Sequence, residues 1–575
     1  MALSGILWTS TAGLQAVQQQ LQWATDNISN AQSPSYARRE STTSSTGVNS
    51  VVVNVARAVN DGLQDQFLAS NSQSSFTTAQ LSYFQDVGNV LGTTQSTPAL
   101  QQVMDNFIGA WKSFETNTSD TSAEAQVVNA GQTLAETITN TSQNLDVVEH
   151  EVRGDVSNAV TTLNSQLQQL DAVNKQLSSN PQAGALNPSL LDTRDSLVRD
   201  ISGSVGVVRI SHQDGSVALY TNGGVALIDH TANQFVWNNP VGTAPWISLA
   251  NSGNGVGPVP SLNDEFTGGK IGAGLRVLAS STAALASTDP NVGMIAKARA
   301  QVDNLAVQLA GQEPGSFGGA YYFATADRVS DLAGGDLTNG AVTASNAVPV
   351  QSGNPLYWGG DYTTNGADAV VAASATSSGY NPIVTPTQLQ NGVAAAVAPL
   401  NNNVYPQPAA AVWTPPANWT GMKLNTFFTI DNGSNATSPG TAPGLSPSAS
   451  FAINPALING AATVKRQSAT PVIAALTDAS RSMLTGGISA TSQTYSGLTV
   501  DIATYHASAQ AAVESDNTRY SQTTQSFDTR LNSATGVNMD TQMAQLTVLQ
   551  NAYAANARVI SSVQQMFETL LSIAQ

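Results

Sequence analysis

The N-terminal stretch MALSGILWTSTAGLQAVQQQLQWATDNISNAQSPSYARRE, residues 1–40, carries a regular apolar pattern that stops at a proline. Its apolar and small residues recur at alternating steps of four and three, which is the heptad pattern of a coiled-coil seam. One helix cannot bury such a stripe alone, and isolated helices are marginally stable in water, so the pattern predicts a partner helix. The seam positions are Leu3, Leu7, Ser10, Leu14, Val17, Leu21, Ala24 and Ile28.

The C-terminal end carries a second seam of the same spacing, starting at Met539 and Gln542. Its other positions are Leu546, Leu549, Tyr553, Asn556, Ile560, Val563, Phe567, Leu570 and Ala574. Asn556 occupies a core position, where a polar residue often fixes register. We expect residues 3–29 and 539–574 to lie side by side and antiparallel. The alternative is that each end is an ordinary amphipathic helix lying on a globular core.

Between the two seams, the longest regular pattern covers residues 122–179, with apolar residues along one face. A helix of this length would extend roughly 85 Å at 1.5 Å per residue, so an elongated domain is expected. A short helix follows in LLDTRDSLVRDIS, residues 190–202, where Asp195 and Arg199 are expected to pair across one turn. The pairs Asp214-Gly215 and Asn222-Gly223 then predict the turns of a small antiparallel meander.

The remaining segments complete a three-part organisation. Residues 49–60 alternate like a strand, and helical patterns cover 271–312 and 498–531. Residues 313–487 are rich in Pro, Gly, Asn, Ser and Thr and predict an inserted β-rich domain.

The expected fold class is therefore α+β multidomain, with paired terminal coiled-coil helices, an elongated helical and β middle domain, and the insertion. The predicted terminal domain comprises 1–35 and 536–575, the middle domain 36–312 and 488–535, and the inserted domain 313–487.

Composition limits the class of partner. The 575 residues carry a net charge of −17, and we find no cluster of Lys and Arg, which argues against nucleic acid. Charged residues make up only 10%, and a surface so poor in charge does little to repel copies of itself. The N-terminus lacks the positive region of a secretory signal, and no run of eighteen apolar residues predicts a membrane span. The absence of cysteine excludes disulfides and thiolate sites.

Candidate catalytic groups are few. The histidines His150, His212, His230 and His506 are dispersed, so no zinc site is predicted. Asp264 with Glu265, or the patch Glu149-His150-Glu151, could be imagined as the acid and base of a wall-degrading hydrolase. A solvated loop and a solvated helix face are the favoured interpretations, and the glycine-rich stretches lack phosphate-binding spacing. We predict no catalytic residue, no metal site and no cofactor.

The end of the first seam resembles a signature shared by bacterial flagellar rod, hook and hook-associated proteins, N-N-I-x-N-x-x-T-P-G-Y. The segment DNISNAQSPSYARR departs from it at Asp26, Ser33 and Ser35. The matching residues are Asn27, Ile28, Asn30, Pro34, Tyr36 and Arg38.

Two further segments resemble the flagellar hook-associated protein 1 (FlgK) family in particular. The first is LLDTRDSLVRDISGSVGV, with Leu191, Asp192, Arg194 and Asp195; the second is FAINPALI, with Asn454 and Pro455. The segment from Gly536 onward is similar to that family's C-terminal helix, with Thr541 and Gln542 where acidic residues are usual.

The resemblance implies a structural protein without a cofactor, exported by the flagellar type III system. Such proteins form the junction between hook and filament by helical self-assembly. The implied partners are further copies of the chain, the hook protein, hook-associated protein 3 and a flagellar export chaperone, with no nucleic acid and no membrane. Two alternatives stay open. One is another axial protein, namely hook-associated protein 3, a flagellin or the hook protein; the other is a secreted hydrolase or adhesin whose function resides in residues 313–487.

Overall fold

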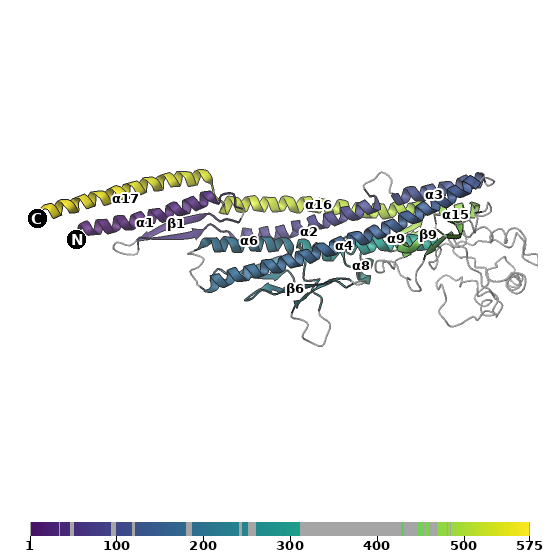
Figure 1. Ribbon diagram of the computed structural model, residues 1–575, viewed down its shortest axis with the longest axis horizontal. Helices are drawn as coiled ribbons and strands as arrows, with labels where there is room; N and C mark the ends of the chain where they lie inside the picture. Colours follow the sequence, from purple (N-terminus) through teal and green to yellow (C-terminus); the bar gives the residue numbers. More distant parts are fainter. Residues whose placement is uncertain are drawn as a thin grey trace, which may run out of the picture.

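The computed structural model is elongated, with the helices running roughly along its length and both chain ends at one extremity (Figure 1). The described residues are 2–33, 35–45, 51–93, 99–117, 121–179, 187–240, 244–250, 260–310, 427–430, 447–453, 455–458, 464, 469–479, 481–483 and 485–573. Among them, no helix combines the length and the apolar character needed to cross a membrane.

Long helices make up most of the described structure. The helices are α1 (Ala2–Ser29), α2 (Asp61–Leu91), α3 (Ala99–Thr116), α4 (Thr121–Ser179), α6 (Pro188–Ser204), α7 (Gly269–Val277), α8 (Thr282–Ala286), α9 (Met294–Ala310), α14 (Pro455–Ile458), α15 (Ala469–Thr477), α16 (Tyr495–Thr535) and α17 (Met539–Ile573), with a 3₁₀ turn η2 (Pro447–Ser450). The expected long helix over 122–179 is confirmed as α4, whose 59 residues bury their apolar face against the neighbouring helices α3, α6, α7 and α9.

The strands form small antiparallel sheets beside the helices. They are β1 (Arg39–Ser45), β2 (Val51–Arg57), β3 (Val207–Ser211), β4 (Val217–Thr221), β5 (Ala226–Ile228), β6 (Phe235–Asn238), β7 (Trp246–Leu249), β8 (Phe428–Ile430), β9 (Phe451–Ile453), β10 (Arg481–Met483) and β11 (Ala490–Gln493). The predicted meander is β3-β4-β5. Its first turn places Gly215 at a φ of +87°, a left-handed conformation that glycine adopts without strain.

The predicted strand over 49–60 is β2, but its partner was not predicted. β1 has the sequence RESTTSS, which lacks the apolar alternation of a half-buried strand. It pairs with β2 over seven positions, from Arg39 opposite Arg57 to Ser45 opposite Val51. The hairpin lies alongside α1, and both of its strands contact that helix (Figure 1).

The predicted antiparallel pairing of the terminal helices is confirmed. Asn27 near the end of α1 bonds Gln542 near the start of α17, and Gly13 in the middle of α1 faces Asn556 in the middle of α17. In Figure 1 the two helices project together from one end of the molecule.

The body has a continuous apolar core that includes part of the region predicted as an insertion. Phe427 and Phe428 lie with ring centroids 5.5 Å from Phe107, and Phe427 lies 5.8 Å from Trp111. Phe451 of β9 stacks on Phe428 at 4.8 Å. The described residues from 427 onward therefore pack into the helical body and not into a separate β-rich domain. Most of the predicted insertion, residues 313–426, lies outside the described residues.

The helical pattern over 271–312 is interrupted in the structure. It divides into α7, α8 and α9, and Gly293 at the last break has a φ of +66°. Helix α9 is buried although many of its residues are polar; Lys297 and Gln301 have no exposed surface. Each buried polar side chain on such a helix needs a partner, because an unpaired polar group away from water is destabilising.

Candidate assembly surface and its junction with the body

Small residues on α1 and larger apolar residues on α17 form the buried centre of the seam between these two helices. On α1 the buried positions include Ser10, Ala16 and Ala24, and on α17 they include Leu549 and Val563. Small side chains let two helix backbones approach closely. At Gly13 a Cβ atom would stand only 3.4 Å from the Asn556 side-chain nitrogen, so little room remains for a larger residue.

The structure places the predicted seam residues in three groups. Leu549 and Val563 are buried, whereas Tyr553, Phe567 and Leu570 are 37%, 37% and 51% exposed. The half-buried positions are Leu7, Leu14, Val17, Leu21, Ile28, Leu546, Asn556 and Ile560. The side chain of Leu3 lies outside the described residues. Within one chain, the last turns of α17 therefore have apolar seam positions that α1 does not cover.

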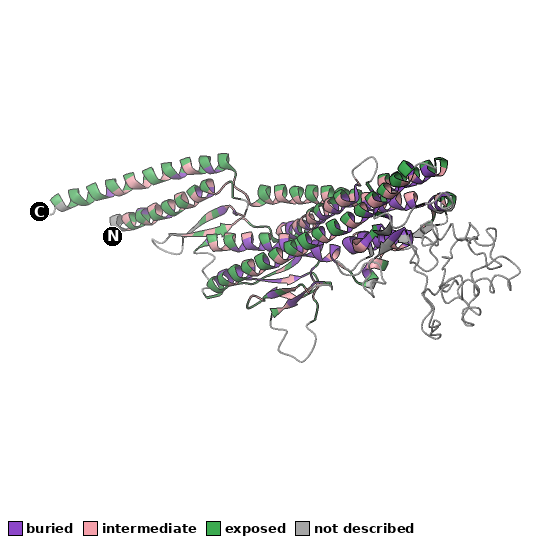
Figure 2. Ribbon diagram, turned by 45° about the vertical axis from the view of Figure 1, so that its right-hand side comes forward, coloured by how far each residue is buried: buried purple, intermediate pink, exposed green. Residues whose placement is uncertain are grey.

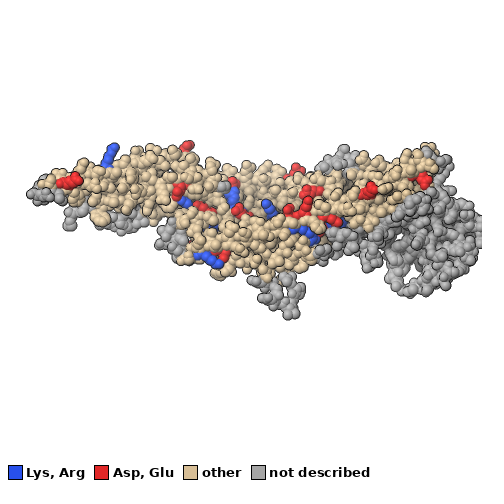
Figure 3. All heavy atoms as spheres, in the orientation of Figure 1, with Lys and Arg blue, Asp and Glu red and all other residues tan. Residues whose placement is uncertain are grey.

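Further apolar side chains lie on the outer faces of the same two helices. Trp8 is 66% exposed and Val548 is 65% exposed. The other large exposed apolar residues are Ile6 on α1 and Met539, Met543, Val559 and Met566 on α17. Figure 2 shows exposed residues along most of α17, in contrast to the buried interior of the body. Few charged side chains interrupt the terminal pair on the face shown in Figure 3. So many exposed apolar side chains on one helix pair are typical of an interaction surface.

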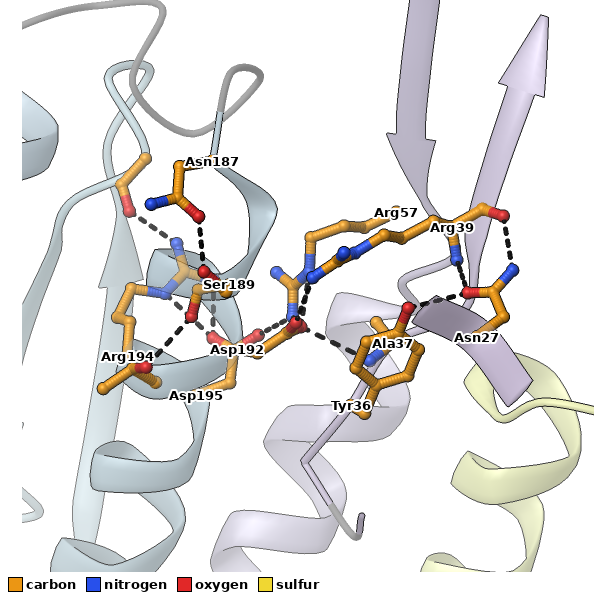
Figure 4. A network of polar contacts seen from close by, with 12 residues as sticks. Asn27, Tyr36, Ala37, Arg39, Arg57, Asn187, Ser189, Asp192, Arg194 and Asp195 are labelled. Atoms are coloured by element: carbon orange, nitrogen blue, oxygen red, sulfur yellow. Dashed lines mark hydrogen bonds and ion pairs between the residues drawn. The ribbon is translucent and has the colours of Figure 1, made fainter. Parts of the chain in front are cut away.

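Asn27 anchors the turn that ends α1. Its amide nitrogen donates to the Arg39 carbonyl at 2.9 Å and to Gln542 Oε1 at 3.0 Å. Its oxygen accepts from the Tyr36 hydroxyl at 2.8 Å and from the Arg39 backbone N–H at 2.9 Å. All the hydrogen-bonding capacity of this buried side chain is used, and Figure 4 shows its bonds to Tyr36 and Arg39. Asn27 and Tyr36 of the predicted signature thus fold the chain back from α1 into β1.

The base of the hairpin carries two arginines that reach the same helix of the body. Arg39 and Arg57 lie opposite each other in the β1–β2 register. Arg57 bonds Asp192 at 2.8 Å and Asp195 at 2.7 Å, while Arg39 approaches Asp192 at 3.5 Å and bonds Asp26 of α1 at 2.7 Å. Figure 4 shows these side chains bridging from the hairpin to α6. We call Asp26, Arg39, Arg57, Asp192, Arg194 and Asp195 the junction network.

The junction network is largely buried, so the loss of one of its members should lower the free energy of unfolding substantially. The arginine side chains Arg39 and Arg57 are 7% exposed, and the carboxylates Asp192 and Asp195 are 14% and 8% exposed. Removing one member of a buried network leaves its partners desolvated and unpaired, which costs about 3–5 kcal/mol. Arg194 completes the network by bonding Asp195 at 2.6 Å and the Gly215 carbonyl of the meander at 2.5 Å.

The prediction that Asp195 and Arg199 form an ion pair is wrong. Arg199 instead bonds Asp528 of α16 at 2.5 Å and lies 4.2 Å over the ring of Phe67. The carboxylate of Asp195 is occupied by Arg57 and Arg194. Partners brought in by the tertiary fold have replaced the local partner that the helix periodicity suggested.

The remaining signature residues have modest or undescribed contacts. Asn30 donates to the Asp26 carbonyl at 2.9 Å, and Leu191 is half-buried beside Gly215. Pro34 and Asn454 lie outside the described residues. Pro455 begins α14, and its side chain is not among those described. Sequence reasoning missed Arg39 and Arg57, and it gave Gln542 only as a seam position and not as a partner of Asn27. A usable signal was the spacing of Asp192 and Asp195, which places two carboxylates on one face of α6.

Glu149, one of the carboxylates considered for hydrolase chemistry, is not poised as a general acid. Glu149 is buried and bonds Arg153 and Arg299, each at 2.6 Å, which corrects the expectation of a solvated face. Burial alone would raise the pKa of the Glu149 carboxyl, but Arg299 and Arg153 outweigh burial and hold that pKa below its usual range. A general acid needs the opposite shift. Among the described residues, no group of three His, Asp or Glu side chains could hold a metal ion.

Comparison with known proteins gives this geometry a family context. The model of the FlgK helical domain matches residues 84–312, which run from the end of α2 through α9. Over these residues the chain is similar to the flagellar hook-associated protein 1 family, which supports its place in that family. A second model, the C-terminal region of the flagellar basal body rod FlgEFG proteins, matches residues 531–573, which include α17. Members of the family are structural proteins of the flagellum.

Curated relatives agree with the family assignment. Flagellar hook-associated protein 1 of Bacillus subtilis is 25% identical over 240 residues, or 39% of this chain and 47% of that protein. The Escherichia coli protein of the same name is 28% identical over 225 residues, or 37% of this chain and 41% of the relative. The matches thus span less than half the length of these relatives. Among solved structures, the flagellar hook junction protein FlgK from Burkholderia pseudomallei aligns with a TM-score of 0.37 and 22% identity, over 45% of this chain and 44% of that one.

Proposed function

We propose that this chain is a structural subunit of the hook–filament junction of the bacterial flagellum, which assembles into a helical array through its terminal helix pair. The exposed apolar surface of α1 and α17 carries the proposal. Residues such as Trp8, Val548 and Leu570 remain in contact with water although the pair is formed. Neighbouring copies packed head to tail would cover them, and a rotation that does not close gives a helical arrangement.

The layout that accompanies this proposal has two described parts. The α1–α17 pair would form an inner tube, and the body from β1 to α9 together with α16 would surround it. The junction network would set the direction in which the body leaves the tube, because its members come from α1, the hairpin and α6. The aromatic contacts of Phe427 and Phe451 support including the described residues between 427 and 483 in the body.

The partners follow from the place of the family in the flagellum. We propose that the chain contacts the hook protein on one side and hook-associated protein 3 on the other. We also propose export through the flagellar type III system, with a chaperone covering the C-terminal apolar surface before assembly. The relatives are named as hook-associated proteins, which supports the hook as one neighbour.

The proposal is tested by complementing a deletion strain and viewing the cells by electron microscopy. The strain should bear hooks without filaments and should shed flagellin into the medium, and the intact chain should restore filaments. A Val548→Asp variant should fold normally by circular dichroism but fail to restore them, because the added charge lies on the proposed contact. Gln550→Asp is the matched control, since Gln550 is an exposed polar residue on the same helix.

Two results would contradict the proposal. One is full filament growth on hooks that carry Val548→Asp. The other is filament growth from a chain truncated after Gly536, which lacks α17. Wall-degrading activity of the purified protein on a zymogram would instead favour a secreted hydrolase.

A further inference from the structure

The interface between α9 and α16 contains a histidine with no access to solvent. His506 on α16 is 2% exposed, and its ring nitrogen Nε2 lies 2.9 Å from Gln301 Oε1 on α9. Gln301 is itself fully buried and donates its amide nitrogen to the Gly486 carbonyl at 2.6 Å. These three residues connect α9, α16 and the turn that leads from β10 to β11.

The hydrogen bonds fix the proton on the imidazole. Because the Gln301 amide nitrogen donates to Gly486, the Gln301 oxygen faces His506 and can only accept. His506 therefore donates from Nε2, and its Nδ1 atom carries a lone pair. No described residue hydrogen-bonds that Nδ1 atom. A second proton would have to be added there, inside the protein and without an acceptor.

We propose that His506 is an acid-sensitive latch, which holds α9, α16 and the 485–488 turn together while its ring is neutral and releases them when the ring is protonated. The charged neighbours favour release. Lys297 on α9, fully buried, donates to the carbonyls of Ser287 and Asp289 at 2.8 and 2.6 Å, so a cationic ring would add a second positive charge to the site.

Other titratable groups near the latch do not compensate a cationic ring. Tyr505 is adjacent on α16, with its ring centroid 5.2 Å from the imidazole. The Asp289 carboxylate pairs with Arg276. Asp501 lies on α16 one turn before Tyr505 and has a raised pKa because of burial. Burial first, and Lys297 second, lowers the pKa of His506 to about 3.

The turn is packed too closely to absorb a movement of the ring. Gly486 has a φ of +59°, and a Cβ atom there would stand 2.6 Å from the Lys297 carbonyl oxygen. Gly487 has a φ of +81°, and a Cβ atom added there would stand 2.3 Å from the Tyr505 hydroxyl oxygen. Displacing the Gln301 amide would therefore displace the turn.

The direction of the pH effect follows from proton linkage. Histidine in an unfolded chain has a pKa of about 6.5. Below that pH, His506 binds a proton in the unfolded chain but stays neutral in the folded chain. The latch contributes its full stability above about pH 6.5, and this contribution is lost as the pH falls toward 3. The folding equilibrium constant should fall by up to about tenfold per pH unit in that window through His506 alone.

The first test observes the ring directly. The full-length chain with His150→Gln, His212→Gln and His230→Gln retains only His506, since the sequence has four histidines. Nitrogen-15 NMR of the labelled imidazole should show a neutral ring protonated at Nε2 from pH 8 to pH 5. A ring that titrates near pH 6.5, or one protonated at Nδ1, would overturn the proposal.

The second test measures the consequence. His506→Gln keeps a donor for Gln301 and removes the titration, so its urea stability should fall less steeply than that of the parent chain between pH 7 and pH 5. Below about pH 6.5, the folding equilibrium constant of the parent chain should fall up to about tenfold more per pH unit than that of His506→Gln. His150→Gln, at an exposed helix position, should follow the parent chain. Equal pH slopes for His506→Gln and the parent would also overturn the latch. Should the variant fail to fold, the NMR measurement decides.

Discussion

The two ends of this molecule use apolar residues in opposite ways. In the body, the α4 residues Leu134, Leu163 and Leu177 are fully buried in the core. Trp111 of α3 is also buried there and contacts the rings of Phe107 and Phe114. In the terminal pair, a seam of similar periodicity is covered on one side only, and Trp8 remains 66% exposed. The apolar residues of the body are therefore buried by other parts of the same chain, whereas those of the terminal pair are partly left exposed to solvent. A stable body that carries an unsatisfied helix pair is suited to assembly.

The largest expected effect contrasts the two tryptophans. Trp111→Ala removes a side chain that is 1% exposed and contacts Phe107, Phe114 and Phe427, so it should destabilise the body by about 3–5 kcal/mol in urea unfolding. Trp8→Ala should change the stability of the isolated chain by less than about 0.5 kcal/mol. Similar losses at both positions would mean that the terminal pair is as well covered as the body.

The next effect concerns the link between the two regions. Asp192→Ala leaves Arg39 and Arg57 with one carboxylate fewer and should lower stability by about 3 kcal/mol. We also expect the terminal helix pair to adopt a wider range of positions relative to the body, because the ion pairs that join the hairpin to α6 are weakened. Asp200→Ala, on the exposed face of the same helix, is the matched control.

That change in position can be measured with spin labels, because the chain has no native cysteine. Gln22→Cys on α1 and Thr161→Cys on α4 are exposed attachment sites. The distance distribution should broaden in Asp192→Ala and stay unchanged in Asp200→Ala. A distribution as narrow as that of the parent would show that the hairpin alone sets the orientation.

A smaller effect tests how close the terminal helices are. Gly13→Leu places a large side chain where the Asn556 amide already stands 3.4 Å from a Cβ position, so the pair should lose about 1–3 kcal/mol. Hydrogen exchange should then be faster in α1 and α17 while α4 keeps its protection. Gly5→Leu is the comparison, since a Cβ at Gly5 meets no atom within 4 Å. Equal exchange in the two variants would contradict the close seam.

The smallest expected effect is at the surface of the body. Lys175 is 62% exposed and bonds Asp171 one turn earlier on α4 at 2.5 Å. The Lys175 end of the pair is exposed although Asp171 is only 16% exposed, and helix pairs four residues apart contribute about 0.3–0.5 kcal/mol. Lys175→Ala should therefore be nearly neutral in urea unfolding, and added salt should reduce the remaining difference from the parent chain because it screens the ion pair. A loss comparable to that of Asp192→Ala would remove the distinction between surface pairs and the junction network.

Sequence alone determined the elements whose signals are local. The 59-residue α4 follows from one apolar face repeated over sixteen turns, and the β3-β4 turn follows from Asp214-Gly215. The antiparallel terminal pair was predicted because both ends show matching seams. In each case the residues that carry the signal are neighbours along the chain, so periodicity or turn chemistry reveals them.

Tertiary structure alone decided which distant residues meet. Arg57 bonds Asp192 across 135 positions of sequence, and the strand β1 has no apolar pattern of its own, because its pairing depends on β2. Phe427 joins the core of α3 from within a stretch whose composition predicted a separate β-rich domain. His506 becomes a buried neutral ring only where α9 and α16 are pressed together. Composition and spacing describe what a segment can form by itself, whereas burial and charge pairing depend on the surfaces that the whole fold places against it.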